Sequence, residues 1–185
     1  MKPLGVGWPN VISGLRILLV PVLVVLVLVD SDPSRWAAAA VFAGGGISDF
    51  FDGYLARRQG TTTRTGMWLD PLSDKLLVSA AVISLVAVDR FPVWAAVVIL
   101  AREVAVTVLR AVRGTRGESM PATFVAKTKT ASQLLAIALY LMPLPHWLRG
   151  VKLGVLIVAV ALTLYSGVDY FVRAFRSPAS ARTAS

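Results

Sequence analysis

Long apolar runs are the feature that most constrains this chain. Six such runs follow one another, separated by short segments of Pro, Gly and charged residues. A helix of about 20 apolar residues crosses the roughly 30 Å of hydrocarbon in a bilayer. The sequence therefore predicts an all-α integral membrane protein with six transmembrane helices, at residues 11–29, 36–57, 68–88, 93–112, 130–142 and 151–171.

Composition agrees with a membrane protein. Of the 185 residues, 56% are hydrophobic and only 16% are charged, which is too little polar surface for a soluble domain of this size. We expect one transmembrane domain, residues 1–177, and a disordered tail, residues 178–185. The net charge of +9 on so apolar a chain favours membrane lipids or anionic substrates as partners, and not nucleic acid.

The distribution of basic residues predicts the orientation. If the N-terminus is inside, most basic residues lie at or towards the inner ends of the predicted spans. Cytoplasmic loops carry an excess of Lys and Arg, so we expect a multi-pass protein of the plasma membrane with both termini in the cytoplasm. Four basic residues are exceptions at the outer ends, namely Arg35, Arg90, Arg149 and Lys152.

Four aspartates are concentrated at the inner ends of the second and third predicted spans. Asp49 and Asp52 are three residues apart on one helix, and Asp70 and Asp74 are four apart on the next, so each pair shares a face. Carboxylates this close raise one another's pKa unless cations neutralise them. The pattern predicts a site for two divalent cations, Mg²⁺ or Mn²⁺. Pairing with nearby arginines, or helix capping by Asp70, is the alternative.

Small and basic residues near this cluster allow two interpretations each. Gly53, Ala56 and Gly66 leave room for a bulky ligand, or else allow close helix packing. A basic cluster lies where the fourth span ends and the fifth begins, and it suits a phosphate monoester or else consists of ordinary cytoplasmic charges. Its main members are Arg102, Arg110, Lys127 and Lys129, and Glu103 is a candidate for orienting a neighbouring arginine.

The acidic segment reads Asp49-x2-Asp52-Gly53-x2-Ala56-Arg57-x8-Gly66-x3-Asp70-x3-Asp74. This pattern resembles the signature of the CDP-alcohol phosphotransferases, which are integral membrane enzymes of phospholipid synthesis. Asn10-x2-Ser13-x2-Arg16 resembles the opening of the first span in these enzymes. The stretches 101–103, 109–110, 127–130 and 162–167 look like the branch that makes phosphatidylglycerophosphate, although Ala126 stands where that branch often has glycine.

The resemblance implies a homodimer of six-helix subunits, each with a polar cavity open to the cytoplasm. It implies that Asp49, Asp52, Asp70 and Asp74 hold two divalent metals and that Asp74 is also the general base. The residues implied to surround the CDP part of the donor are Asn10, Ser13, Gly53, Ala56, Arg57 and Gly66.

The expected reaction transfers the phosphatidyl group of CDP-diacylglycerol to sn-glycerol 3-phosphate, giving phosphatidylglycerophosphate and CMP. The acceptor phosphate is expected to contact Arg102, Arg110, Lys127 and Lys129. Two other activities of the family, phosphatidylinositol-phosphate synthase and cardiolipin synthase, remain as alternatives. A divalent-cation transporter is an alternative from another class, although such sites tend to lie near the bilayer midplane.

Overall fold

The computed structural model describes residues 8–59, 64–114 and 124–176, and side chains at residues 14–48, 73, 75–109, 112 and 128–172. This part of the chain is all α, as expected, and contains no strand. Each of the six predicted spans overlaps a helix, although the fifth helix begins earlier than predicted. The elements are α1 Trp8–Val29, α2 Asp32–Gln59, α3 Arg64–Ala87, α4 Val93–Gly114, α5 Phe124–Leu141, the 3₁₀ turn η1 His146–Leu148 and α6 Arg149–Arg176.

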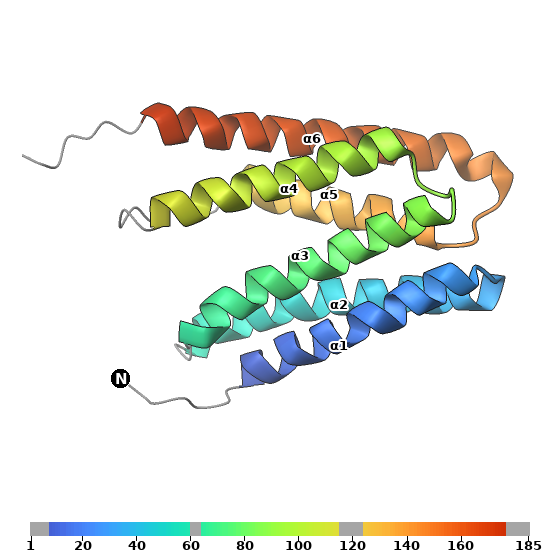
Figure 1. Cartoon of the computed structure of the whole chain (residues 1–185), viewed down its shortest axis with the longest axis horizontal. Coiled ribbons are helices and arrows are strands. Elements are labelled where there is room, and N and C mark those ends of the chain that lie inside the picture. The colour runs from blue at the N-terminus through green and yellow to red at the C-terminus, as the bar shows by residue number, and fades with distance from the viewer. Residues whose placement is uncertain (1–7, 60–63, 115–123, 177–185) are drawn as a thin grey trace, which may run out of the picture.

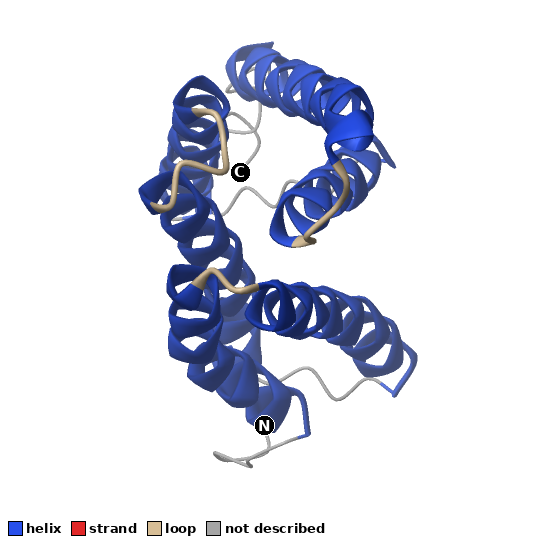
Figure 2. Cartoon of the chain, turned by 90° about the vertical axis from the view of Figure 1, so that its right-hand side faces the viewer, coloured by secondary structure: helices blue, strands red, loops and turns tan. Residues whose placement is uncertain are grey.

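The helices form two groups of three, and consecutive helices run antiparallel (Figure 1). Helices α1, α2 and α3 pack together, as do α4, α5 and α6, and the groups meet through α2, α3, α4 and α5. Figure 2 shows the two groups from the end of the bundle. We call the end where α1 begins the near end and the end where α1 finishes the far end. The near end holds the last turns of α2 and the first turns of α3.

Local signals in the sequence explain the tight turn between α1 and α2. Asp30 has a left-handed backbone, φ 50°, and follows the last residue of α1, a position where such a conformation commonly ends a helix. Ser31 then caps α2. The Ser34 backbone N–H donates to Ser31 Oγ at 3.3 Å, and the Ser31 N–H donates to Ser34 Oγ at 3.0 Å. This reciprocal pair satisfies helix donors that otherwise lack partners.

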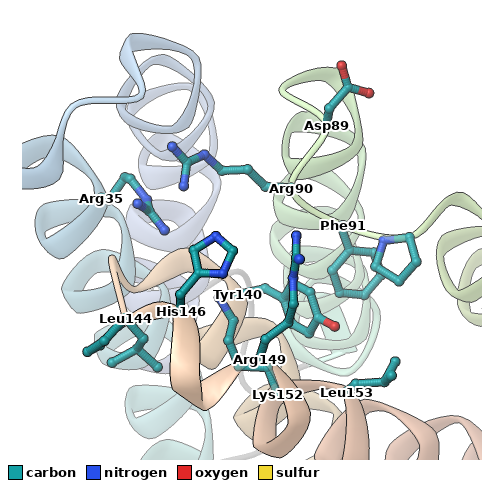
Figure 3. Close-up of a pocket in the computed structure, with 12 residues that line it drawn as sticks. Arg35, Asp89, Arg90, Phe91, Tyr140, Leu144, His146, Arg149, Lys152 and Leu153 are labelled. Atoms are coloured by element: carbon teal, nitrogen blue, oxygen red, sulfur yellow. The ribbon is translucent and has the colours of Figure 1, made fainter.

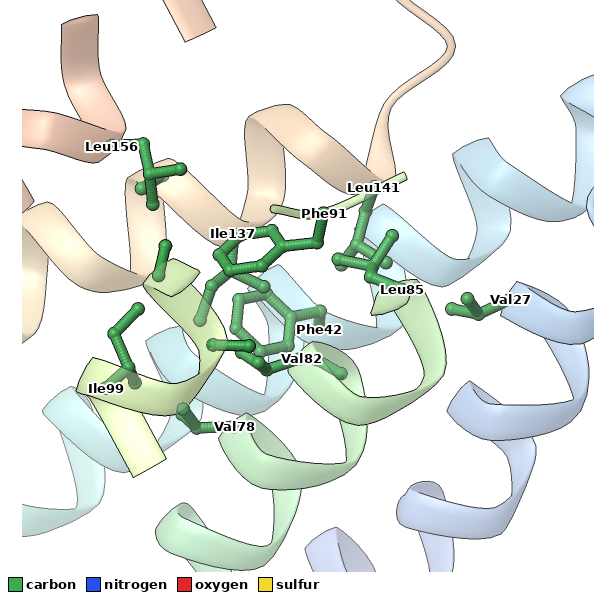
Figure 4. Packing of buried hydrophobic residues seen from close by; sticks show 14 of the residues in the cluster. Val27, Phe42, Val78, Val82, Leu85, Phe91, Ile99, Ile137, Leu141 and Leu156 are labelled. Carbon is green, nitrogen blue, oxygen red and sulfur yellow. The ribbon is translucent and has the colours of Figure 1, made fainter. Parts of the chain in front are cut away.

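The core lies where the two groups of helices meet (Figure 4). Phe42 of α2, Leu85 of α3 and Ile137 of α5 are each at most 1% exposed. Phe91, in the turn before α4, meets the edge of the Tyr140 ring, with centroids 5.0 Å apart and planes at 67°. Interlocking side chains of this kind gain many small dispersion contacts, which hold the two groups in register.

One helical stretch in the described part of the chain is long and apolar enough to cross a membrane. It is His146–Val172, with 27 residues and a mean hydropathy of 2.0. Gly14–Val29 and Lys75–Ala87 are apolar but shorter. Charged residues such as Arg102 and Glu103 interrupt other helices. One span is therefore supported by length and composition, and the remaining five stay predictions.

Candidate functional site

The four signature aspartates lie on two neighbouring helices at the near end. Asp49 and Asp52 belong to the last turns of α2, and Asp70 and Asp74 belong to the first half of α3. Helices α2 and α3 pack against each other. The helical spacings expected from the sequence are therefore present in the backbone. The side chains of all four aspartates lie outside the described residues.

The predicted donor-binding residues come from the same end of the bundle. Asn10 and Ser13 lie in the first two turns of α1, and Gly66 lies in the first turn of α3. Gly53, Ala56 and Arg57 lie in the last two turns of α2. Their side chains, too, are outside the described part. Three helices thus bring the metal-binding and donor-binding candidates to one end.

A buried arginine connects α1 to the acidic region. Arg16 is 3% exposed, and its Nη1 donates to the hydroxyl of Ser73 at 3.3 Å. Ser73 is fully buried on α3 and directly precedes Asp74. Arg16 is the third residue of the Asn10-x2-Ser13-x2-Arg16 stretch. This residue thus holds α1 against the helix that carries Asp70 and Asp74.

Glu103 of α4 lies at the centre of a second polar cluster. Its carboxylate accepts a hydrogen bond from the ammonium of Lys129 on α5, and it lies 3.2 Å from Nη1 of Arg102. Lys129 is only 4% exposed. A buried ammonium is costly unless it is paired and hydrogen-bonded, and Glu103 supplies both. The expected pairing of Glu103 with an arginine is confirmed, and its bond to Lys129 was not predicted.

The same cluster extends to α3 and α6. Lys75, which follows Asp74, donates to the hydroxyl of Thr107, and that hydroxyl donates to the Glu103 carbonyl oxygen. Nη2 of Arg102 donates to Ser166 Oγ at 2.8 Å. A Cβ added at Gly167 would lie 3.4 Å from Arg102 Cγ, which is van der Waals contact, so the arginine packs directly against α6 at this position. The cluster therefore joins four helices.

A small cavity of about 40 Å³ borders this cluster. Glu103, Lys129 and Lys75 line it together with Gln133, whose Oε1 is buried without a hydrogen-bond partner. A cavity of this size holds about one water molecule, and it offers both donors and an acceptor. Arg102 and Lys129, two of the four predicted acceptor-binding residues, are thus brought together through Glu103.

The other two acceptor-binding candidates occupy the same pair of helices. Arg110 lies two turns beyond Arg102 on α4, and Lys127 lies half a turn before Lys129 on α5. Their side chains are outside the described part of the chain. Among the side chains that are described, no group of three or more His, Asp or Glu residues is arranged to hold a metal ion. The four aspartates are not among those side chains.

Comparison with known proteins gives one consistent result. The family model described as CDP-alcohol phosphatidyltransferase matches residues 6–165. A "Probable phosphatidylglycerophosphate synthase" of Mycobacterium tuberculosis is 39% identical over 170 residues, covering 90% of this chain and 81% of that protein.

Two further relatives are named "CDP-diacylglycerol--glycerol-3-phosphate 3-phosphatidyltransferase". The Bacillus subtilis protein is 40% identical, over 88% of this chain and 92% of that protein. The Escherichia coli protein is 32% identical, over 88% of this chain and 91% of that protein. The match of the family model extends over most of the chain, and it includes every residue of the Asp49–Asp74 signature. The chain therefore belongs to the CDP-alcohol phosphatidyltransferase family.

Proposed function

We propose that this chain transfers the phosphatidyl group of CDP-diacylglycerol to sn-glycerol 3-phosphate, releasing CMP and phosphatidylglycerophosphate. The observation that carries the proposal is the complete signature on the adjoining near ends of α2 and α3, in a chain whose relatives are named for this reaction. The buried basic cluster around Glu103 on α4, α5 and α6 supports an anionic acceptor.

The carboxylate ligands that the signature offers suit divalent metal ions. Four carboxylates provide the hard oxygen ligands that Mg²⁺ and Mn²⁺ prefer, and the family is generally divalent-metal dependent. In this proposal Asp49, Asp52, Asp70 and Asp74 hold two such ions. When bound, the ions neutralise the donor pyrophosphate and stabilise CMP as the leaving group.

Asp74 is the proposed general base. Its carboxylate takes the proton of the acceptor hydroxyl, whose oxygen then attacks the lipid-side phosphorus while the bond from that phosphorus to the CMP oxygen breaks. The backbone at Asp74 is well held, because Ser73 is fully buried and bonded to Arg16, and Lys75 is bonded to Thr107. A well-held backbone at this position favours the fixed geometry between base and hydroxyl on which proximity catalysis depends.

Acceptor and donor are bound by different helices in this scheme. Arg102 and Lys129, oriented by Glu103, face the acceptor phosphate together with Arg110 and Lys127. Guanidinium groups suit a phosphate because they donate two parallel hydrogen bonds. The CDP part of the donor lies among residues of α1, α2 and α3, namely Asn10, Ser13, Gly53, Ala56, Arg57 and Gly66.

The proposed setting is a multi-pass protein of the plasma membrane. Large apolar side chains cover the outside of the bundle, including Leu18 of α1 at 67% exposed and Val104 of α4 at 63%. Water-soluble monomers rarely expose apolar surface on this scale. We infer six spans within a single domain at residues 1–177, with both termini and the polar cavity on the cytoplasmic side. The homodimer remains a prediction from the family resemblance.

A CMP-release assay tests the proposal directly. Detergent-solubilised protein receives Mg²⁺, CDP-diacylglycerol and one acceptor at a time: sn-glycerol 3-phosphate, inositol phosphate, inositol, serine or phosphatidylglycerol. We expect turnover with sn-glycerol 3-phosphate. Turnover only with inositol phosphate or phosphatidylglycerol would assign a different reaction of the same family. Ion flux in vesicles without CMP release would favour the transporter.

Substituting the base tests the mechanism. Asp74→Asn removes the proton acceptor and also the negative charge of one proposed metal ligand. We therefore expect CMP release to fall by at least about 100-fold at saturating Mg²⁺. The matched control is Asp89→Asn, because Asp89 is exposed at the far end and asparagine tolerates its left-handed backbone, φ 55°. Near wild-type activity of Asp74→Asn would contradict the assignment.

A further inference from the structure

A second and larger cavity lies at the far end of the bundle, beside the starts of α2, α4 and α6 (Figure 3). Its volume is about 580 Å³, and its lining includes Arg35, Arg90, Arg149, Lys152, His146 and Tyr140. The first four are the basic residues that the sequence places at the outer ends of the spans, against the general trend of this chain. Three separate segments, namely the start of α2, the turn after α3 and the start of α6, bring these exceptions into one cavity.

Two of the four are partly neutralised. Arg90 forms a double contact with Asp30, with Nε 2.6 Å from Oδ1 and Nη2 donating to Oδ2 at 3.0 Å. Arg35 donates from Nη2 to the carbonyl of Met142 at 2.8 Å and lies 3.6 Å from Asp32, whose side chain is 80% exposed.

The Arg35 guanidinium retains an unused hydrogen-bond donor. Its Nε is buried and has no hydrogen-bond partner. Burial is the main cause that lowers the pKa of Arg35, and the charge of Arg90 lowers it further. An anion beside these two arginines would offset both effects.

The other two cations have no carboxylate partner among the described residues. The ammonium of Lys152 lies 4.9 Å from the centroid of the Tyr140 ring. Arg149 lies in the first turn of α6 beside the same ring (Figure 3). Asp89 is the one acidic residue of the lining, and Figure 3 shows its carboxylate pointing away from the basic side chains. The cavity therefore keeps an excess of positive charge.

The backbone adds to this charge. Helix α4 begins just after Pro92 and α6 begins at Arg149, and both Pro92 and Arg149 line the cavity. The N-terminus of a helix carries a partial positive charge and N–H groups without helical partners. Trp36, at 52%, and Trp147, at 78%, are exposed at the same end, as expected for residues at a membrane interface.

We propose that the far-end cavity binds a phosphate group, and that its occupant is the headgroup of an anionic phospholipid from the leaflet at that end. The basic side chains meet the phosphate, and the apolar lining residues Leu144 and Leu153 continue from them toward the exposed apolar surface. The site is separate from the reaction centre, which lies at the opposite end of the same helices. A soluble phosphate shares this chemistry, and the experiment distinguishes the two sources.

A binding titration tests the proposal. Detergent-solubilised full-length protein is titrated with dihexanoylphosphatidylglycerol, with the zwitterionic dihexanoylphosphatidylcholine, and with inorganic phosphate. We expect the anionic lipid to bind and the zwitterionic lipid not to bind. Inorganic phosphate should compete only weakly, and phosphate that binds as tightly as the anionic lipid would overturn the assignment of the site to a lipid headgroup. Equal binding of both lipids would overturn the proposal.

Substitutions place the binding within the molecule. Arg149→Gln and Lys152→Gln each remove a cation without an acidic partner, so each should weaken the binding of dihexanoylphosphatidylglycerol by about tenfold. Arg173→Gln is the matched control, because it makes the same charge change about 36 Å farther along α6. All three variants should keep CMP release, which shows that they are folded. Wild-type affinity in both cavity variants would overturn the proposal.

Discussion

Glu103 is a single carboxylate that serves several partners. The carboxylate accepts a hydrogen bond from Lys129 and lies 3.2 Å from Arg102. The backbone carbonyl oxygen of Glu103 accepts a hydrogen bond from Thr107. Lys129 is almost completely buried, so the carboxylate of Glu103 is an important counter-charge for it. Removing one member of a buried ion pair leaves the other without compensation, and this costs more than the pair itself contributes. Glu103 should therefore be important for stability as well as for orientation.

The residue-scale prediction is a double-mutant cycle. Glu103→Gln should lower the free energy of unfolding by about 3 kcal/mol, because the buried ammonium of Lys129 loses the negative charge of Glu103. Lys129→Met added to Glu103→Gln should recover part of this loss, since no buried ammonium remains. Thermal unfolding in detergent measures both changes. If the two substitutions are simply additive, the proposed dependence of Lys129 on Glu103 is wrong.

At the scale of elements, the run Gly44-Gly45-Gly46 determines how closely α2 approaches its neighbours. A Cβ added at Gly45 would lie 2.7 Å from Cδ2 of Leu77 on α3, and one at Gly46 would lie 3.3 Å from Cδ1 of Leu134 on α5. Nothing lies within 4 Å of a Cβ at Gly44. Helix α2 is therefore packed between α3 and α5 through two successive glycines. Small residues at these two positions therefore allow close helix packing.

Alanine substitutions separate packing from helix propensity. Gly44→Ala should raise the free energy of unfolding by up to about 1 kcal/mol, because alanine favours the helix. Gly45→Ala gains the same propensity, but its methyl group meets Leu77, which is fully buried and has little room to move. Overpacking costs about 1–3 kcal/mol, so we expect net destabilisation and reduced CMP release. Equal unfolding temperatures for the two variants would contradict this account.

At the scale of the whole molecule, the bundle has two chemically different ends. The near end carries the signature aspartates on α2 and α3, and the far end carries the basic cavity. The predicted topology places the near end in the cytoplasm. This arrangement puts the reaction beside the leaflet that water-soluble sn-glycerol 3-phosphate reaches from the cytoplasm.

The absence of cysteine from the chain makes this topology measurable. A cysteine at Asp32, whose side chain is 80% exposed in the first turn of α2, should react with a membrane-impermeant maleimide in intact cells. A cysteine at Thr62, between α2 and α3, should react only after the membrane is opened. CMP release shows that both variants are folded. The reverse labelling pattern would invert the predicted orientation.

Much of the fold follows from the sequence, because apolar runs and breakers such as Pro92 mark where helices lie. The fifth helix shows the limit of that approach. The helix begins at Phe124, whereas the predicted span begins at residue 130. The prediction begins late because Lys127 and Lys129 lower the hydropathy of the first turns of this helix. Lys129 is nevertheless buried there, paired with a carboxylate from α4. Hydropathy cannot anticipate a charge that a distant residue neutralises.

The two sites likewise differ in how far the sequence predicts them. Spacing alone predicted that Asp49 and Asp74 belong to adjacent helix ends, since short-range periodicity determines which residues share a face. The far-end cavity depends instead on tertiary packing. The sequence identified Arg35 and Lys152 as exceptions to the charge distribution, but it contained no signal that α2 and α6 would bring them to one cavity.

The contact between Arg90 and Asp30 has a mechanical consequence. It joins the turn after α3 to the turn after α1, and so fixes these two helices to each other at the far end of the bundle. Helix α1 has 22 residues and is about 33 Å long, so a tilt of about 5° about this contact would displace the opposite end of the helix by about 3 Å. The bond of Arg16 to Ser73, nearer that opposite end, opposes such a tilt, so the two contacts together keep α1 aligned with the helix that carries Asp70 and Asp74.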